Sequence, residues 1–163
     1  MSDNELVGAR QFCTFELNGL LFGIEVVEVQ EVLRYQNMTQ VPLAPDMVRG
    51  LINLRGQIVT AVDLRSRFDF PPLPEGVLPM NIVVRTDEGP VSFLVDEIGD
   101  VVEVNDEAFE SPPGNLTGFA REATLGVYKL KHRLLLILDT HRILDLDTPN
   151  ESHRNPGEHA RAA

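Results

Sequence analysis

Two stretches of this chain repeat the same pattern 76 residues apart, and this repeat constrains the fold more than any other feature. The segment GLINLRGQIVTAVDLRSRF at 50–68 lies over GVYKLKHRLLLILDTHRIL at 126–144. A second shift, of 71 residues, lays LLFGIEVV at 20–27 over VSFLVDEI at 91–98. Both shifts preserve the order of elements, which favours a duplicated unit. The alternative is a chance likeness between apolar hairpins, and the residues alone leave it open.

Each repeat consists of short runs rich in Val, Ile, Leu and Phe, separated by turn residues, which is typical of an all-β chain. Asn18-Gly19 predicts a tight hairpin, because both central residues of a type I′ turn need positive φ. The segment 26–35 predicts a helical turn leading into a strand, and 42–50 predicts a loop with one short helical turn. A stub of helix is expected at 64–68.

The expected architecture is two small five-stranded antiparallel β-barrels with short helices, packed around a shared core because each barrel alone would be marginally stable. The segment 69–79 contains four prolines and one glycine, so we interpret it as the linker. The first barrel then spans about 11–68 and the second about 80–146. Residues 1–10 are expected to be flexible, and the tail 147–163, which lacks large apolar residues, to be disordered.

The net charge of −11 argues against binding to nucleic acid and to anionic membrane surfaces. The N-terminus lacks the basic and apolar regions of a secretory signal, and no apolar run is long enough to span a bilayer. We therefore expect a cytoplasmic protein that does not insert into membranes.

No arrangement of residues predicts an enzyme or a cofactor site. The four histidines have no metal-ligand spacing, and Cys13 is expected to face the core. Asp63 and Asp139 each precede a helical stub, which favours N-capping over acid–base chemistry. Nine carboxylates and no Lys or Arg lie between Asp87 and Glu110, which indicates a solvated face or a steering field toward a basic partner.

Four segments carry a family resemblance: FGIEVVEVQEVLR at 22–34, VPLAPDMVRGLINLRGQIVTAVDLRSRF at 41–68, FLVDEIGDVVEV at 93–104 and LLLILDTHRIL at 134–144. Together they resemble the CheW family of chemotaxis coupling proteins over residues 11–146. The resemblance implies a non-enzymatic, SH3-like pair of barrels without a cofactor. It implies two partners, the regulatory domain of a CheA-type histidine kinase and the cytoplasmic tip of methyl-accepting chemoreceptors, and recruitment to membrane-associated receptor arrays.

The resemblance also implies a receptor-binding surface in a groove between the barrels. Its residues in this sequence would be Val29, Glu31, Gly50, Arg55, Ile98 and Val101. Small β-branched side chains on a rigid strand can receive the apolar face of a helix. Without the resemblance, Val29, Ile98 and Val101 are better explained as core residues. Arg55 is then explained equally well as a solvated turn residue or as an interface anchor.

Two alternatives remain at this stage. The chain could serve a chemosensory pathway other than swimming, such as surface motility or second-messenger control, or it could be a barrel that senses a small molecule. A sensor should contain an enclosed pocket, whereas a scaffold should have filled barrels and an exposed groove. Thr60-Ala61 replaces a proline found in many family members, which affects the expected kinase interface.

Overall fold

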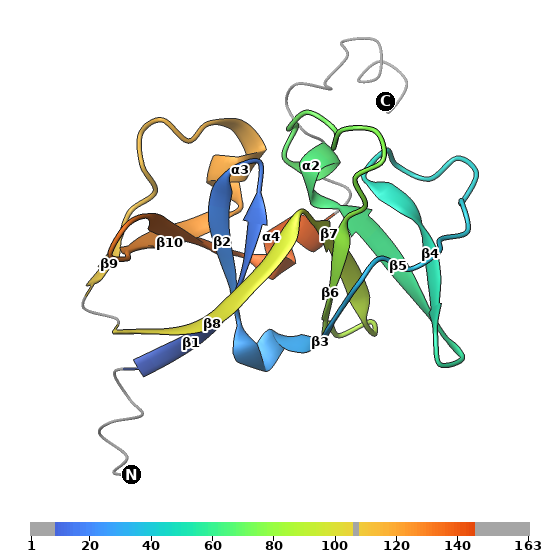
Figure 1. The fold of residues 1–163 in the computed structure, drawn as a ribbon, viewed down its shortest axis with the longest axis horizontal. Helices are drawn as coiled ribbons and strands as arrows, with labels where there is room; N and C mark the ends of the chain where they lie inside the picture. Colours follow the sequence, from blue (N-terminus) through green and yellow to red (C-terminus); the bar gives the residue numbers. More distant parts are fainter. Residues whose placement is uncertain (1–8, 106–107, 146–163) are drawn as a thin grey trace, which may run out of the picture.

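The computed structural model describes residues 9–105 and 108–145 and arranges them in two β-sheets that lie side by side (Figure 1). In order of pairing, the six-stranded sheet contains β8 (Glu97–Asn105), β1 (Ala9–Leu17), β2 (Leu20–Glu25), β11 (Leu134–Leu138), β10 (Thr124–Lys129) and β9 (Phe109–Glu110). The five-stranded sheet contains β3 (Val29–Leu33), β6 (Met80–Val84), β7 (Val91–Val95), β5 (Gln57–Asp63) and β4 (Val48–Leu54). The short helices are η1 (Val26–Glu28), α2 (Leu64–Arg67), α3 (Gly118–Glu122) and α4 (Thr140–Leu144).

The internal repeat is present in the fold. A shift of 76 residues takes β4, β5 and α2 onto β10, β11 and α4, and a shift of 71 takes β2 onto β7. The two helices also begin alike, because Asp63 accepts backbone N–H hydrogen bonds at the start of α2, and Asp139 does so at the start of α4. The predicted N-capping roles of both aspartates are therefore confirmed.

The all-β architecture of two small barrels is confirmed, but the prediction that each barrel is one contiguous segment is wrong. The six-stranded sheet takes β1 and β2 from before the 69–79 linker and its other strands from after it. The five-stranded sheet likewise combines β3, β4 and β5 with β6 and β7. Each half of the chain therefore contributes strands to both sheets.

The prediction of purely antiparallel sheets is also wrong. The strand β5 pairs in parallel with β7, and β11 pairs in parallel with β2. These two pairs are related by the internal repeat, and in each of them a strand from one half of the chain meets a strand from the other. Each sheet combines strands from the two halves of the chain, which we call strand exchange. It explains both differences from the prediction, because only strands that follow each other through a tight turn must run antiparallel.

Both sheets curl so that their edges approach each other. In the five-stranded sheet, Thr39, which follows edge strand β3, exchanges two backbone hydrogen bonds with Leu51 of the opposite edge strand β4 (2.9 and 2.8 Å). In the six-stranded sheet only three residues separate β8 at one edge from β9 at the other. So short a connection requires the sheet to wrap into a barrel.

The predicted shared core is confirmed, and each barrel has an interior cluster as well. Side chains of both sheets and of α2, α3 and α4 form the shared cluster, which includes Phe15, Phe22, Phe68, Phe93 and Phe119. A second cluster fills the five-stranded barrel with residues such as Ile52 and Val59. A third fills the six-stranded barrel with residues such as Phe12 and Tyr128.

The local predictions have mixed outcomes. Asn18 and Gly19 have φ of +53° and +79°, which confirms the tight hairpin, and η1 leads into β3 as expected. The helical turn expected within 42–50 is absent, because β4 already begins at Val48. Residues 9 and 10 belong to β1, whereas the flexibility predicted for the residues before them, and the disorder predicted for 147–163, lie outside the described residues.

Candidate functional site

The clearest feature of the predicted receptor surface is an ion pair between Glu31 of β3 and Arg55 at the tip of the β4–β5 hairpin. Arg55 has a φ of +50° and Gly56 a φ of +89°, the left-handed conformations that a type I′ turn requires. The turn is held by the side-chain oxygen of Asn53, which accepts a hydrogen bond from Gly56 N–H at 2.9 Å. The hairpin thus presents the guanidinium to the edge strand of the same barrel.

Solvent reaches the two members of this pair unequally. The Arg55 side chain is 71% exposed, whereas that of Glu31 is 22% exposed. The hydrogen bond from Arg55 lowers the pKa of Glu31, and the same bond raises the pKa of Arg55. Exposed ion pairs contribute little to folding stability. The arrangement therefore holds the Arg55 side chain in a fixed orientation at an exposed hairpin tip.

The three predicted groove residues with branched apolar side chains have different surroundings. Val29 and Ile98 are half-buried and pack against the shared core. Val101 is 57% exposed and lies opposite Cys13 in the β1–β8 pair. The start of β3 is fixed by Arg85, which donates hydrogen bonds to the Val29 carbonyl (2.9 Å) and to the Val27 carbonyl (3.0 Å). Only Val101 therefore offers a mostly exposed apolar surface.

Gly50 has a steric role in the structure. It is buried in β4, and a Cβ at this position would lie 2.7 Å from the Thr39 carbonyl oxygen and 3.0 Å from Cβ of Met38. These neighbours belong to the segment that bridges β3 to β4. A glycine is required here because any side chain would press on the bridge that closes the barrel.

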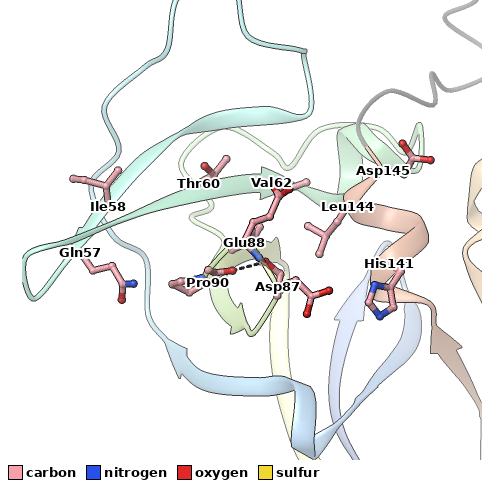
Figure 2. Close-up of a pocket in the computed structure, with 13 residues that line it drawn as sticks. Gln57, Ile58, Thr60, Val62, Asp87, Glu88, Pro90, His141, Leu144 and Asp145 are labelled. Carbon is pink, nitrogen blue, oxygen red and sulfur yellow. Dashed lines mark hydrogen bonds between the residues drawn. The ribbon is translucent and has the colours of Figure 1, made fainter.

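The predicted surface does not coincide with either cavity found in the described part of the chain. The larger cavity, of about 550 Å³, lies between β5, the β6–β7 turn and α4 (Figure 2). Its lining residues are Gln57, Ile58, Thr60, Val62, Thr86, Asp87, Glu88, Gly89, Pro90, Val91, His141, Leu144 and Asp145. The sequence analysis did not predict this cleft. The only sequence feature that pointed to it was the acidic turn beginning at Asp87.

The smaller cavity, of about 250 Å³, lies beside the proline-rich linker. Tyr35 and Met38 line it together with linker residues and two ion-paired arginines, Arg49 and Arg65. Both guanidiniums are already bound by aspartates, so the cavity offers no unpaired cation to an anionic ligand.

The Arg65–Asp96 pair connects the two halves of the chain. Arg65 donates to both carboxylate oxygens of Asp96 at 2.7 and 2.6 Å, and the Asn18 backbone N–H donates to the same carboxylate at 2.9 Å. Burial opposes the charged form of Asp96, but these hydrogen bonds outweigh it and lower the pKa of Asp96. The hydrogen bond to Asp96 raises the pKa of Arg65. One carboxylate of the acidic stretch is therefore structural.

Arg67 is a second internal connection that sequence reasoning missed. It is fully buried, and its guanidinium donates to the carbonyls of Ile143 (3.1 Å) and Asp145 (2.6 Å) at the end of α4. The guanidinium carbon also lies 3.9 Å from the ring centroid of Phe119. From the sequence, an arginine in so short a helix is expected to be exposed to solvent. Arg67 is buried only because α2 packs against α4.

Clusters of buried apolar side chains occupy the interiors of both barrels. Within residues 9–105 and 108–145, no group of three or more His, Cys, Asp or Glu could hold a metal ion, and no helix is long and apolar enough to cross a bilayer. Burial raises the pKa of the Cys13 thiol, which disfavours the reactive thiolate. The fold and these surfaces define a paired-barrel binding module.

Comparison with known proteins identifies which such module this is. Residues 11–148 match the CheW-like domain. The chemotaxis protein CheW of Treponema pallidum (strain Nichols) is 30% identical over 140 residues, covering 82% of this chain and 81% of the relative. That of Klebsiella aerogenes is 31% identical over 140 residues, covering 86% and 84%. The crystal structure of the scaffolding protein TtCheW from Thermoanaerobacter tengcongensis matches with a TM-score of 0.75 and 25% identity, covering 85% of this chain and 94% of that one.

The chain belongs to the CheW family. Membership of the family confirms the resemblance seen in the sequence. It also assigns the chain to the class of signalling scaffold and adaptor proteins. The match ends beyond α4 and begins within β1, so it covers both barrels.

Proposed function

We propose that this chain is a non-enzymatic scaffold of bacterial chemotaxis. It couples the cytoplasmic tips of methyl-accepting chemoreceptors to the regulatory domain of a CheA-type histidine kinase. It acts in the cytoplasm, at membrane-associated receptor arrays. Membership of the CheW family supports this assignment, and so do relatives named as chemotaxis proteins and a solved structure described as a scaffolding protein.

The receptor surface in this proposal is centred on Glu31 and Arg55, and the preformed ion pair between them is the observation that carries it. A hairpin tip held by a type I′ turn loses little conformational entropy when a partner binds. Arginine is enriched among the residues that dominate binding energy, and its planar group suits carboxylates on a partner helix. Val101 adds exposed apolar area, while Val29, Ile98 and Gly50 hold the strands that display these groups.

Charge reversal at the pair tests this surface. We expect Arg55→Glu to weaken binding of a receptor cytoplasmic fragment at least about tenfold, because it removes an exposed anchor and adds a like charge beside Glu31. The midpoint of thermal unfolding should stay unchanged, because an exposed pair contributes little to stability. Lys131→Glu is the matched control, since the 76-residue shift relates Lys131, on the other hairpin, to Arg55.

A double variant distinguishes direct contact of the ion pair with the receptor from a role of the pair in holding the hairpin. Arg55→Glu combined with Glu31→Arg restores an ion pair of the opposite orientation. If the charges meet the receptor directly, this double variant stays defective. Recovery of receptor binding in the double variant would show that the pair only holds the hairpin. Equal losses from Lys131→Glu and Arg55→Glu would contradict the assigned surface.

Kinase binding is expected on a different face. In the same series, Arg55→Glu should leave the affinity for the kinase regulatory domain within about twofold of the unchanged chain, because a scaffold must hold both partners at once. Parallel loss of both affinities would indicate a single shared site and would contradict the coupling role.

A further inference from the structure

We propose that the cleft between β5, the β6–β7 turn and α4 is a docking site for a partner helix that carries an apolar stripe flanked by Lys or Arg. None of the residues assigned above to the receptor surface lines this cleft. The inference therefore goes beyond the proposed function by adding a third interaction surface to the molecule.

The floor of the cleft is apolar and continuous with the shared core. Val62 is buried, and Val91 and Leu144 are half-buried against that core. Side chains alternate along β5, so Thr60 and Ile58 continue the face of Val62 outward, and Ile58 is 59% exposed. Figure 2 shows Ile58, Thr60 and Val62 along β5 and Leu144 across from them on α4.

The rim of the cleft is acidic. Its 13 lining residues include the carboxylates Asp87, Glu88 and Asp145 and neither Lys nor Arg. Among the described residues, no ion pair involves Asp87 or Glu88. In Figure 2 these two side chains stand between β5 and His141 of α4. An apolar floor with an anionic rim is complementary to an amphipathic cationic segment.

The walls of the cleft are preformed, so a partner need not order them. In the β6–β7 turn, the Thr86 hydroxyl donates to the Gly89 carbonyl (2.5 Å) and accepts from the Glu88 N–H (3.1 Å). The helix α4 is capped by Asp139 at its start and held by buried Arg67 at its end. Preorganisation of this kind lowers the entropic cost of association.

A helix suits the cleft better than a small molecule does. Small-molecule sites enclose most of their ligand and direct a few polar groups toward it. Here the cleft leaves Ile58 largely exposed, and its charged side chains carry one sign. Apolar side chains at positions i, i+3 and i+4 of a helix can occupy the floor while basic neighbours meet the rim.

Two designed 18-residue helical peptides test the site on the full chain. Both carry leucine at i, i+3, i+4 and i+7, with lysine in one peptide and glutamate in the other at all flanking positions. We expect the lysine peptide to shift the backbone amide NMR signals of Ile58, Thr60, Val91 and Leu144, and the glutamate peptide to leave them in place. Ile58→Ser should weaken the lysine peptide's binding at least about fivefold without unfolding the chain, because Ile58 is exposed.

Charge variants distinguish binding of the lysine peptide at this cleft from nonspecific attraction of the peptide to an acidic protein. Asp87→Asn with Glu88→Gln should weaken binding of the lysine peptide roughly two- to thirtyfold at low salt, and the difference should shrink as salt rises. Asp100→Asn with Glu103→Gln, an exposed pair on β8, is the matched control. Equal losses in the two double variants, equal binding of the two peptides, or shifts centred on β8 would each overturn the proposal.

Discussion

Substitution of Gly50 by alanine distinguishes a packing role from a binding role at this position. An added Cβ would lie 2.7 Å from the Thr39 carbonyl oxygen, closer than real Cβ contacts come. Because that oxygen accepts the Leu51 N–H that closes the barrel, the bridge must shift. Overpacking of this kind costs about 1–3 kcal/mol, and the lower entropy of the unfolded alanine chain offsets up to about 1 kcal/mol. We expect a net loss of about 1–2 kcal/mol.

For a chain of this length, that loss corresponds to a decrease of about 2–8 °C in the unfolding midpoint. Urea unfolding followed by circular dichroism gives the same quantity, provided that the slope with denaturant is unchanged. Gly114→Ala is the matched control, since a Cβ there meets no atom within 4 Å, and its stability should be unchanged or slightly raised. Undiminished stability of Gly50→Ala together with lost receptor binding would refute the steric explanation and make Gly50 a contact residue.

Three further predictions concern the internal connections. Asp96→Asn should cost about 1–3 kcal/mol of unfolding free energy near pH 7. Since the folded pKa of Asp96 lies below its ordinary value of 3.8, this difference should persist above pH 3.8 and shrink as the pH falls below it, which urea unfolding between pH 2 and 7 measures. Arg67→Met should lower the unfolding midpoint by several degrees and broaden the amide signals of α4, because carbonyls at its end lose their donor. Asp139→Ala should cost about 1 kcal/mol through loss of the α4 N-cap, again by urea unfolding.

The repeat and the turn residues predicted most of the strands, because these signals are local. The Asn18-Gly19 turn and the capping aspartates Asp63 and Asp139 each act within a few residues of the chain. The same patterns say nothing about which distant strand lies at an edge. The placement of β1 and β2 among strands of the second half, and of β6 and β7 among strands of the first, therefore could not be predicted from periodicity.

The site was predictable to a lesser degree. The family motif located Glu31 and Arg55, and the structure joins them. The structure also explains why position 50 is a glycine. The sequence alone could not show this, because the Thr39 carbonyl approaches Gly50 only in the closed barrel. Arg67 and the cleft beside α4 depend on contacts between the two halves, and such contacts leave no mark on local composition.

Strand exchange has a consequence for a scaffold. Each barrel contains strands from both halves of the chain, and Arg65–Asp96 and Arg67–α4 connect the halves again. The chain passes between the two barrels after β2 and again after β7, and separation of the barrels would require breaking the shared core and the hydrogen bonds from Arg67 to the end of α4. The two docking faces proposed above would keep a fixed relative orientation on such a body, which a coupling protein needs in order to transmit a change from one partner to the other.

Simultaneous binding of both partners is the most direct test of the coupling role. The purified chain would be sedimented with membrane-anchored receptor fragments, with and without the soluble kinase regulatory domain. We predict that the kinase domain sediments only when this chain is present, and that Arg55→Glu removes both this chain and the kinase domain from the pellet. Competition between the kinase domain and the receptor for this chain, or binding to neither, would contradict it.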